Sequence, residues 1–149
     1  MKFIFFCLIF PVATVFSIEK QGYNHSVNVA YDLVLPSRII ENCYGLNERP
    51  GVVLDAKDNA QIVAEALRIQ KYVDYKVEYV QIGLYADVEK IWWLDARLPF
   101  NYSNLPPGFI FPKIPTYFAI EVEGRGRKRG EWFALRHDKR GRAFLCGHF

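Results

Sequence analysis

Two cysteines far apart in the sequence, Cys43 and Cys146, most constrain what this chain can fold into. The third cysteine, Cys7, lies in an N-terminal stretch that has the pattern of a secretory signal peptide: Lys2, an apolar run over 3–10, and small residues up to Ser17. Removal of residues 1–17 leaves an even pair in an oxidising compartment, where exposed unpaired thiols are a liability. We therefore predict a disulfide between Cys43 and Cys146; the alternative is two buried free cysteines.

The remaining residues, 18–149, are enough for one domain. The whole chain is 51% hydrophobic and 23% charged, a mixture that excludes a disordered or collagen-like protein. No apolar run after residue 17 approaches the roughly 20 residues that span a bilayer. We therefore expect a single soluble, secreted domain in the extracellular space.

The charge of the chain is small overall but unevenly distributed. The full sequence has a formal net charge of +3, and removal of Lys2 reduces it to +2. That value gives no reason to expect nucleic acid or a membrane surface as a partner. Residues 125–149, however, have eight Lys or Arg against two acidic residues, while residues 18–124 have a net charge of −4. A basic surface near the C-terminus is expected.

The hydrophobic pattern predicts helices early in the chain and strands late. Residues 24–35 have the pattern of one or two strands, and Ser37 is expected to cap a short helix that stops at Gly45. Asp55 should cap a helix over 56–72, where apolar residues recur at helical spacing. The later part of the chain alternates and is rich in turns, so we predict an α+β domain.

Several short motifs follow one another in an order that resembles a known family. They are VQIGL, IWWLDA and YSNLPPG within residues 80–108, then Gly130-Glu131-Trp132, and finally Phe144-Leu145-Cys146. This order is similar to that of the C-type lectin-like domain family, whose first helix has a cysteine that pairs with the last one, as Cys43 would here. The resemblance implies two helices packed on antiparallel sheets with a long loop region. It also implies a protein that binds carbohydrate or protein ligands and is not an enzyme.

The sequence departs from the family pattern in ways that affect function. Ala96 and Leu105 replace the usual Gly and Trp, and the family's second disulfide has no cysteines, since Phe118 and His137 lie near the expected positions. Family members that bind sugar through calcium place acidic or amide residues in the long loop and on the next strand. Here those segments read Phe109-Ile110-Phe111-Pro112-Lys113 and Trp132-Phe133-Ala134, with few of the oxygens that calcium needs. We therefore expect no metal site and no cofactor.

The long loop supplies the first group of candidate ligand-binding residues. These are Asn101, Tyr102, Asn104, Phe109, Phe111 and Lys113. The apolar residues of this loop either face solvent, which would suit a protein or lipid surface, or pack inward in place of the missing disulfide. The sequence leaves both alternatives open.

A second candidate surface is the basic run GRGRKRG at 124–130. Its spacing matches neither nucleotide-binding fingerprint and no helical pattern follows it, so we expect the tip of a hairpin. Its cations are either solvated or bind a polyanion such as a sulfated glycosaminoglycan through charge-assisted contacts. The candidate residues are Arg125, Arg127, Lys128 and Arg129.

Two features complete the sequence-based prediction. Asn24 and Asn101 each begin an N-glycosylation sequon. No catalytic motif is recognisable, and His137 and Asp138 are expected to be neighbours on a strand that point to opposite faces, so we name no catalytic residues. A hydrolase with a site hidden from sequence is the alternative, and the oligomeric state is not indicated.

Overall fold

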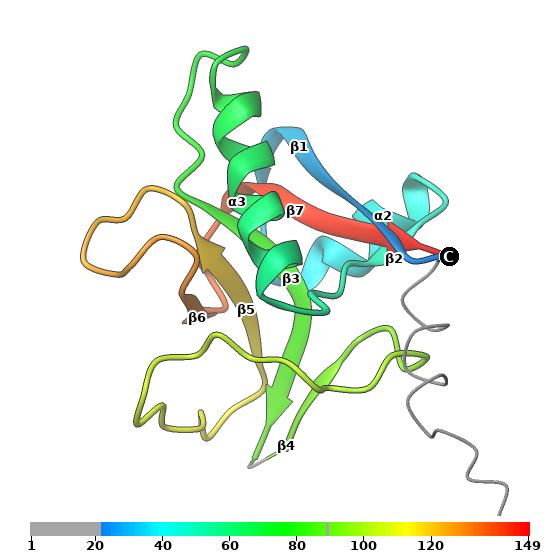
Figure 1. The fold of residues 1–149 in the computed structure, drawn as a ribbon, viewed down its shortest axis with the longest axis vertical. Coiled ribbons are helices and arrows are strands. Elements are labelled where there is room, and N and C mark those ends of the chain that lie inside the picture. The colour runs from blue at the N-terminus through cyan, green and yellow to red at the C-terminus, as the bar shows by residue number, and fades with distance from the viewer. Residues whose placement is uncertain (1–21, 89) are drawn as a thin grey trace, which may run out of the picture.

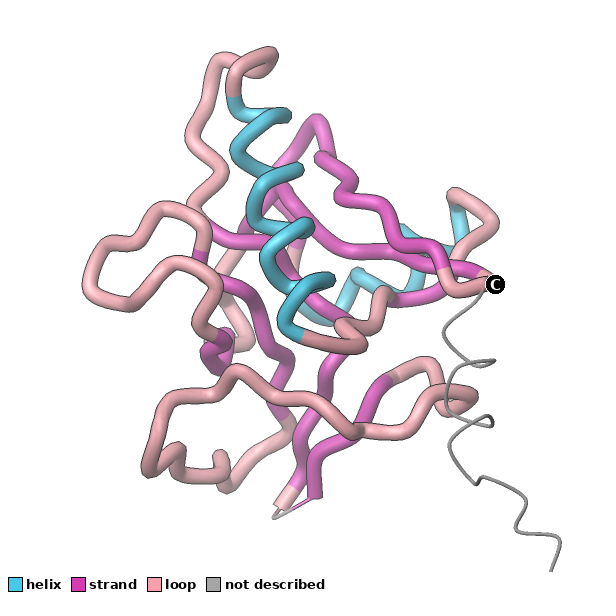
Figure 2. The backbone as a smooth tube through the Cα atoms, viewed as in Figure 1, coloured by secondary structure: helices cyan, strands magenta, loops and turns pink. Residues whose placement is uncertain are grey.

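The computed structural model describes residues 22–88 and 90–149, and Figures 1 and 2 show the arrangement of the elements. The predicted signal peptide, residues 1–17, lies outside the described residues. The helices are a 3-10 turn η2 (Pro36–Arg38), α2 (Ile39–Gly45) and α3 (Ala56–Gln70). The strands are β1 (Asn24–Val34), β2 (Arg49–Pro50), β3 (Tyr79–Asp87), β4 (Lys90–Trp93), β5 (Thr116–Glu121), β6 (Trp132–Leu135) and β7 (Gly141–His148).

The strands form one seven-stranded sheet with β7 and β3 near its centre. The order is β1-β7-β3-β5-β6, with β2 paired to β7 and β4 paired to β3. All pairings are antiparallel except that of β3 with β7, which is parallel. The predicted α+β class is confirmed, and the parallel pair is a feature that the prediction of antiparallel sheets did not include.

Helix α3 forms where the sequence predicts it. The Asp55 side chain accepts a 2.8 Å hydrogen bond from the backbone N–H of Asp58, which caps the helix, and the helix ends at Gln70 rather than at residue 72. Ile62 and Ala66 are fully buried against the sheet. Burial of the Ile62 side chain alone contributes about 2 to 3 kcal/mol. In the described part of the chain no helix is both long and apolar enough to cross a membrane.

Helix α2 begins differently from the prediction. Pro36 opens the 3-10 turn η2, which runs directly into α2, so Ser37 lies within the turn and Arg38 occupies the N-cap position. No side chain caps α2. The predicted Ser37 cap was therefore wrong, because a proline-initiated turn replaced the expected capping residue.

Strand β7 separates two hydrophobic clusters because its side chains alternate between the two faces of the sheet. Ala143 and Leu145 pack into the large cluster that contains the apolar side of α3. Phe144 and Cys146 pack into a smaller cluster with Ile39 of α2. The two helices thus cover opposite faces of the same strand.

Candidate functional site

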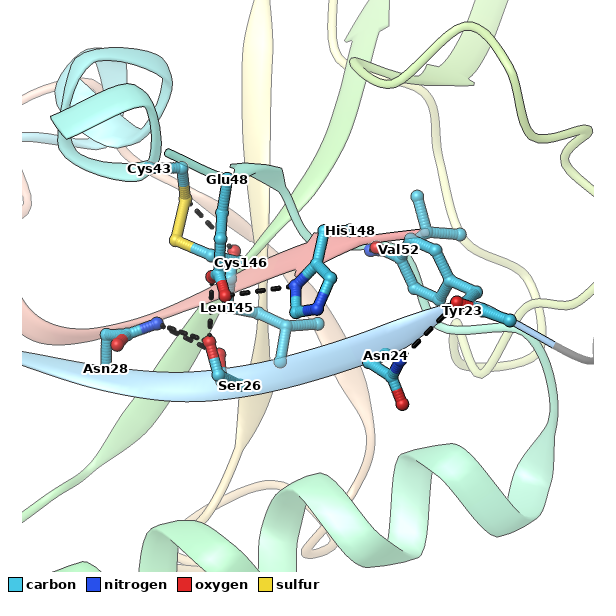
Figure 3. Close-up of polar contacts among 11 residues, drawn as sticks. Tyr23, Asn24, Ser26, Asn28, Cys43, Glu48, Val52, Leu145, Cys146 and His148 are labelled. Atoms are coloured by element: carbon cyan, nitrogen blue, oxygen red, sulfur yellow. Dashed lines mark hydrogen bonds and ion pairs between the residues drawn. A yellow bond between two sulfur atoms is a disulfide. The ribbon is translucent and has the colours of Figure 1, made fainter. Parts of the chain in front are cut away.

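A disulfide joins the two described cysteines and confirms the pairing predicted from their number. Cys43 of α2 and Cys146 of β7 are bonded, with their Cα atoms 5.5 Å apart, and both are fully buried (Figure 3). The alternative of two free cysteines was wrong. The bond fixes the short helix α2 against the centre of the sheet.

Ser26, Glu48 and His148 form a polar network beside the disulfide (Figure 3). The Ser26 hydroxyl donates to Glu48 Oε2 at 2.9 Å, and Glu48 Oε1 lies 3.2 Å from His148 Nδ1. A serine nucleophile needs its proton accepted by the imidazole, with the carboxylate behind the histidine. Here the carboxylate lies between the two, so the network supports the junction of β1 and β7 rather than nucleophilic chemistry.

The IWWLDA motif supplies a buried carboxylate that is paired with a partly exposed arginine. Asp95 is 1% exposed, and Arg97 donates to its two carboxylate oxygens from Nε at 2.8 Å and Nη2 at 2.6 Å. Arg49 lies 3.7 Å away. The hydrogen bonds from Arg97 hold the pKa of the Asp95 carboxyl below its usual range despite the opposing effect of burial. Asp95 is therefore an ionised, fully paired group with no oxygen free for an external ligand.

Asn104, one of the predicted ligand residues, anchors the long loop to the sheet. Its side-chain amide donates a 2.7 Å hydrogen bond to the Gly130 carbonyl oxygen, and its backbone carbonyl oxygen accepts a 3.0 Å hydrogen bond from the backbone N–H of Trp132. Asn59 of α3 donates to the same Gly130 oxygen at 2.9 Å. Asn104 thus positions the loop and is itself committed within the protein.

The long loop divides into an inward anchor and an outward surface. Tyr102 packs edge-on against Trp132 with ring centroids 5.5 Å apart, and Phe109 packs against Phe118 at 5.7 Å. Phe118 is fully buried, so it fills space in the core near the position where the family places a cysteine. The inward-packing alternative therefore holds for Tyr102 and Phe109.

The remaining apolar residues of the loop face solvent. Ile110 is 86% exposed, Ile114 is 60% exposed and Phe111 is 40% exposed. Lys113, which lies among them in the sequence, is exposed, and so is Asn101 in the first part of the loop. We call Ile110, Phe111, Lys113 and Ile114 the loop rim. The solvent-facing alternative therefore holds for the rim, and the two alternatives left open by the sequence apply to different residues of one loop.

The residues of this region do not fit a calcium ion. Calcium needs six to eight oxygens, several from carboxylates. The rim offers hydrocarbon and an ammonium group, and none of its four side chains has an oxygen. Across residues 22–88 and 90–149, no group of three or more His, Cys, Asp or Glu side chains lies close enough together to hold a metal ion.

The basic run lies at the turn between the paired strands β5 and β6, as predicted. Gly124, Gly126 and Gly130 have φ angles of 80°, 77° and 89°, which glycine adopts without strain. They shape an open cavity of about 640 Å³ along the turn. All four predicted cations are exposed, and three of them, Arg127, Lys128 and Arg129, line this cavity.

Most of these cations already have partners. Arg125 pairs with Glu123 at 3.1 Å, and the Arg129 guanidinium donates to the Val122 carbonyl oxygen at 2.7 Å. The guanidinium of Arg127 lies 4.1 Å above the Phe133 ring. Lys128 has no ion pair among the described residues, so its ammonium group is the most available of the four.

Asn24 and Asn101, which begin the two sequons, are both exposed, and their glycosylation stays a prediction.

His137 and Asp138 lie in a turn between β6 and β7 rather than on a strand, and the Asp138 carboxylate is paired with Arg136 at 2.8 Å. The expected strand placement was wrong because β6 ends at Leu135.

The sequence analysis missed a cleft between β1 and the α3–β3 connection. An open cavity of about 770 Å³ is lined there by two exposed tyrosines, Tyr31 and Tyr72, and by two aspartates, Asp32 and Asp74. We call these four residues the tyrosine cleft. The only sequence signal is the recurrence of Tyr with Asp in YD at 31–32 and YVDY at 72–75.

Solved structures resemble this protein, whereas sequence comparisons find no match. No protein-family model and no curated protein sequence matches the chain. The cow C-type carbohydrate-recognition domain of CD23, determined in the presence of a GlcNAc2Man3 oligosaccharide, aligns with a TM-score of 0.61 at 15% identity, over 85% of this chain and 88% of that one. Human lithostathine aligns with a TM-score of 0.62 at 18% identity, over 84% and 82% of the two chains.

A third solved structure extends the comparison. A calcium-independent type II antifreeze protein aligns with a TM-score of 0.61 at 13% identity, over 85% of each chain. At such low identities the similarity concerns the fold. It covers nearly all of the described residues and nearly all of each similar structure.

Proposed function

This chain has the C-type lectin-like fold, and we propose from that premise that it is a secreted protein that binds a carbohydrate or protein ligand. The ligand contacts the loop rim, and binding does not use the calcium ligands of the family's sugar site. The predicted signal peptide and the buried disulfide support export to an oxidising compartment. The C-type carbohydrate-recognition domain of cow CD23 has the same fold.

The observation that carries the proposal is the exposure of apolar side chains on an anchored loop. Phe109 fixes the middle of the loop in the core, while Ile110, Phe111 and Ile114 point outward. A group of exposed apolar residues held on a fixed backbone is a feature of recognition surfaces, because little conformational entropy is lost on binding. Lys113 among them adds a donor and a positive charge.

The proposal is tested on an array of glycans and an array of extracellular protein domains. The double variant Ile110→Ser/Phe111→Ser should lose the binding that the wild-type protein shows. The matched control is Tyr44→Ser/Leu46→Ser, which removes two exposed apolar side chains, 59% and 50% exposed, from the end of α2. Retention of binding by the loop variant, or loss in both variants, would overturn the role of the rim.

Chelation tests the metal-independent part of the proposal. Binding to the same arrays should be unchanged in EDTA, because the rim has no set of oxygens suited to calcium. Loss of binding in EDTA that is restored by added calcium would show that a calcium site exists and would contradict the proposal.

The second candidate function is recognition of a polyanion, such as a sulfated glycosaminoglycan, by the basic turn. It is favoured by the exposed cations around an open cavity, with Lys128 unpaired among the described residues. Retention on immobilised heparin should fall steeply with salt as counterions compete. It should also fall when Arg125, Arg127, Lys128 and Arg129 are all replaced by Gln.

A control with the same change of charge separates the turn from general electrostatic attraction. It replaces four other exposed cations by Gln, namely Arg38, Lys57, Arg68 and Lys71. Equal retention of the turn variant and the wild-type protein would remove this candidate, as would equal losses in the turn variant and the control.

A further inference from the structure

The tyrosine cleft is a second concave surface, separate from the loop rim and from the basic turn. One wall is the middle of β1, which supplies Tyr31 and Asp32, and the other is the connection from α3 to β3, which supplies Tyr72 and Asp74. Both segments lie in the upper part of Figure 1. Arg142 at the start of β7 and Tyr75 complete the cavity of about 770 Å³.

The two tyrosines are unusually exposed for aromatic side chains. Tyr31 is 92% exposed and Tyr72 is 79% exposed. Neither ring contributes to a hydrophobic cluster in the described structure. Tyrosine is among the residues that contribute most to binding energy at interfaces, because a large ring is buried at a low entropy cost. Two such rings that line the same cavity therefore indicate a binding surface.

The charges of the cleft are not balanced within it. Asp32 and Asp74 are exposed, and neither forms an ion pair with any residue of the described structure. Arg142, the one cation that lines the cavity, donates to the Tyr31 carbonyl oxygen and lies 4.5 Å from the Tyr75 ring centroid. The cleft therefore presents two carboxylates, which only accept hydrogen bonds, against the single positive charge of Arg142, so its formal net charge is −1.

The aromatic rings of this region already contact guanidinium groups of the protein. Arg142 lies over Tyr75, and Arg68 lies 5.9 Å from the Tyr72 ring centroid. Tyr31 carries no such cation in the described structure. A cation over a tyrosine face at an exposed site contributes about 0.5 to 1 kcal/mol. Tyrosine rings beside carboxylates can bind a positively charged group that contacts a ring and a carboxylate at the same time.

Comparison of ligand classes favours a cation over a neutral or acidic group. A guanidinium or ammonium group gains more than a sugar hydroxyl, because it adds Coulomb attraction to the carboxylates and a cation–π contact with a tyrosine ring to the hydrogen bond that both ligands can make. An acidic group would be repelled by the two carboxylates. We propose that the tyrosine cleft binds an arginine or lysine side chain from a basic segment of a partner protein.

The proposal is tested by NMR titration of the secreted protein with a short blocked peptide, acetyl-Gly-Arg-Arg-Gly-amide. The amide resonances of Tyr31, Asp32 and Asp74 should shift. The affinity should fall about five- to tenfold in Asp32→Asn/Asp74→Asn, which keeps the shape and removes both charges. Tyr31→Leu or Tyr72→Leu should each cost roughly twofold to fivefold. The matched control, Asp87→Asn/Asp138→Asn, removes two charges outside the cleft and should leave the affinity unchanged.

Three results would overturn the proposal. They are the absence of shifts in the cleft, equal affinity of the wild-type protein and Asp32→Asn/Asp74→Asn, and equal binding of methyl β-galactoside, which would assign the cleft to a neutral sugar. The loop variant Ile110→Ser/Phe111→Ser should bind the basic peptide normally. The peptide titration therefore tests the proposal for the cleft independently of the proposed function of the loop rim.

Discussion

The indole N–H of Trp132 in β6 donates a 2.7 Å hydrogen bond to the side-chain oxygen of Asn59 in α3. Both residues are buried, and the amide nitrogen of Asn59 donates to the Gly130 carbonyl oxygen at 2.9 Å. Asn104 of the long loop reaches the same oxygen. One buried amide thus connects the long helix, the edge strand β6 and the base of the loop that carries the rim.

Replacement of Asn59 by alanine should therefore destabilise the protein strongly. The substitution leaves the Trp132 indole N–H buried without an acceptor, which costs about 1 to 3 kcal/mol, and it also removes the packing of the amide. Chemical denaturation measures the change in the free energy of unfolding. Gln61→Ala changes an exposed residue of the same helix and should stay within about 0.5 kcal/mol of the wild type. A similar small change in Asn59→Ala would show that the hydrogen bond contributes little.

Loss of the disulfide should cost more than any single hydrogen bond. The bond between Cys43 and Cys146 spans a sequence separation of 103 residues, and removal of a native disulfide from a small domain costs about 2 to 5 kcal/mol. Thermal unfolding of Cys43→Ala/Cys146→Ala, compared with the wild type with and without reductant, measures the loss. The reduced wild type should resemble the variant. Stability that does not change on reduction would contradict this prediction.

Two buried tyrosines should respond in opposite ways to removal of the hydroxyl. Burial raises the pKa of both Tyr23 and Tyr79 to about 12, so both are protonated at neutral pH. The Tyr23 oxygen accepts a 2.8 Å hydrogen bond from the backbone N–H of Val52 (Figure 3), whereas the Tyr79 hydroxyl has no partner among the described residues. Tyr23→Phe should cost about 1 to 3 kcal/mol, and Tyr79→Phe should be neutral or stabilising. Equal losses in denaturation experiments would disprove the contrast.

The pairing of the buried Asp95 carboxylate with Arg97 should make stability depend on pH in the acid range. Because Arg97 lowers the pKa of Asp95 in the folded protein, the stabilisation is complete above the ordinary aspartate pKa of about 3.9. It is lost as the pH falls below that value through the lowered pKa. Asp95→Asn should therefore flatten the dependence of unfolding free energy on pH below about 4.

The exposed pair of Arg136 and Asp138 provides the control for this measurement. It has the same spacing of two residues and similar contacts, at 3.2 and 2.8 Å, but its groups are solvated. Asp138→Asn should leave the pH dependence almost unchanged, because exposed ion pairs contribute little. The same flattening in both variants would mean that burial of Asp95 is irrelevant.

Features marked by a local pattern, or by a pair of cysteines with no other partner, could be predicted from the sequence, and features set by other distant contacts could not. Asp55 and the apolar spacing after it define α3 locally, and the even cysteine count defines the disulfide. Phe109 points inward while Ile110 points to solvent, because Phe109 packs against Phe118. Phe118 lies in β5, outside the loop, where it pairs with Ala134 of β6. No local pattern carries that information.

The tyrosine cleft illustrates the same limit at the level of function. Its walls are about forty residues apart in sequence and meet only because β1 pairs with β7 beside the end of α3. The hydrogen bond from Arg142 to the Tyr31 carbonyl oxygen, which places only one cation beside the two carboxylates, is likewise a tertiary contact. Sequence reasoning could identify exposed tyrosines and aspartates only as separate surface residues.

The position of β7 also determines when the protein can fold during its synthesis. β7 pairs with β1, β2 and β3, so three earlier strands have unsatisfied edges until residues 141–148 have left the ribosome. Contacts between such distant segments fold slowly and expose strand edges to aggregation in the meantime. The sheet therefore cannot be completed until β7 docks between β1 and β3, which makes this strand the keystone of the order in which the elements assemble.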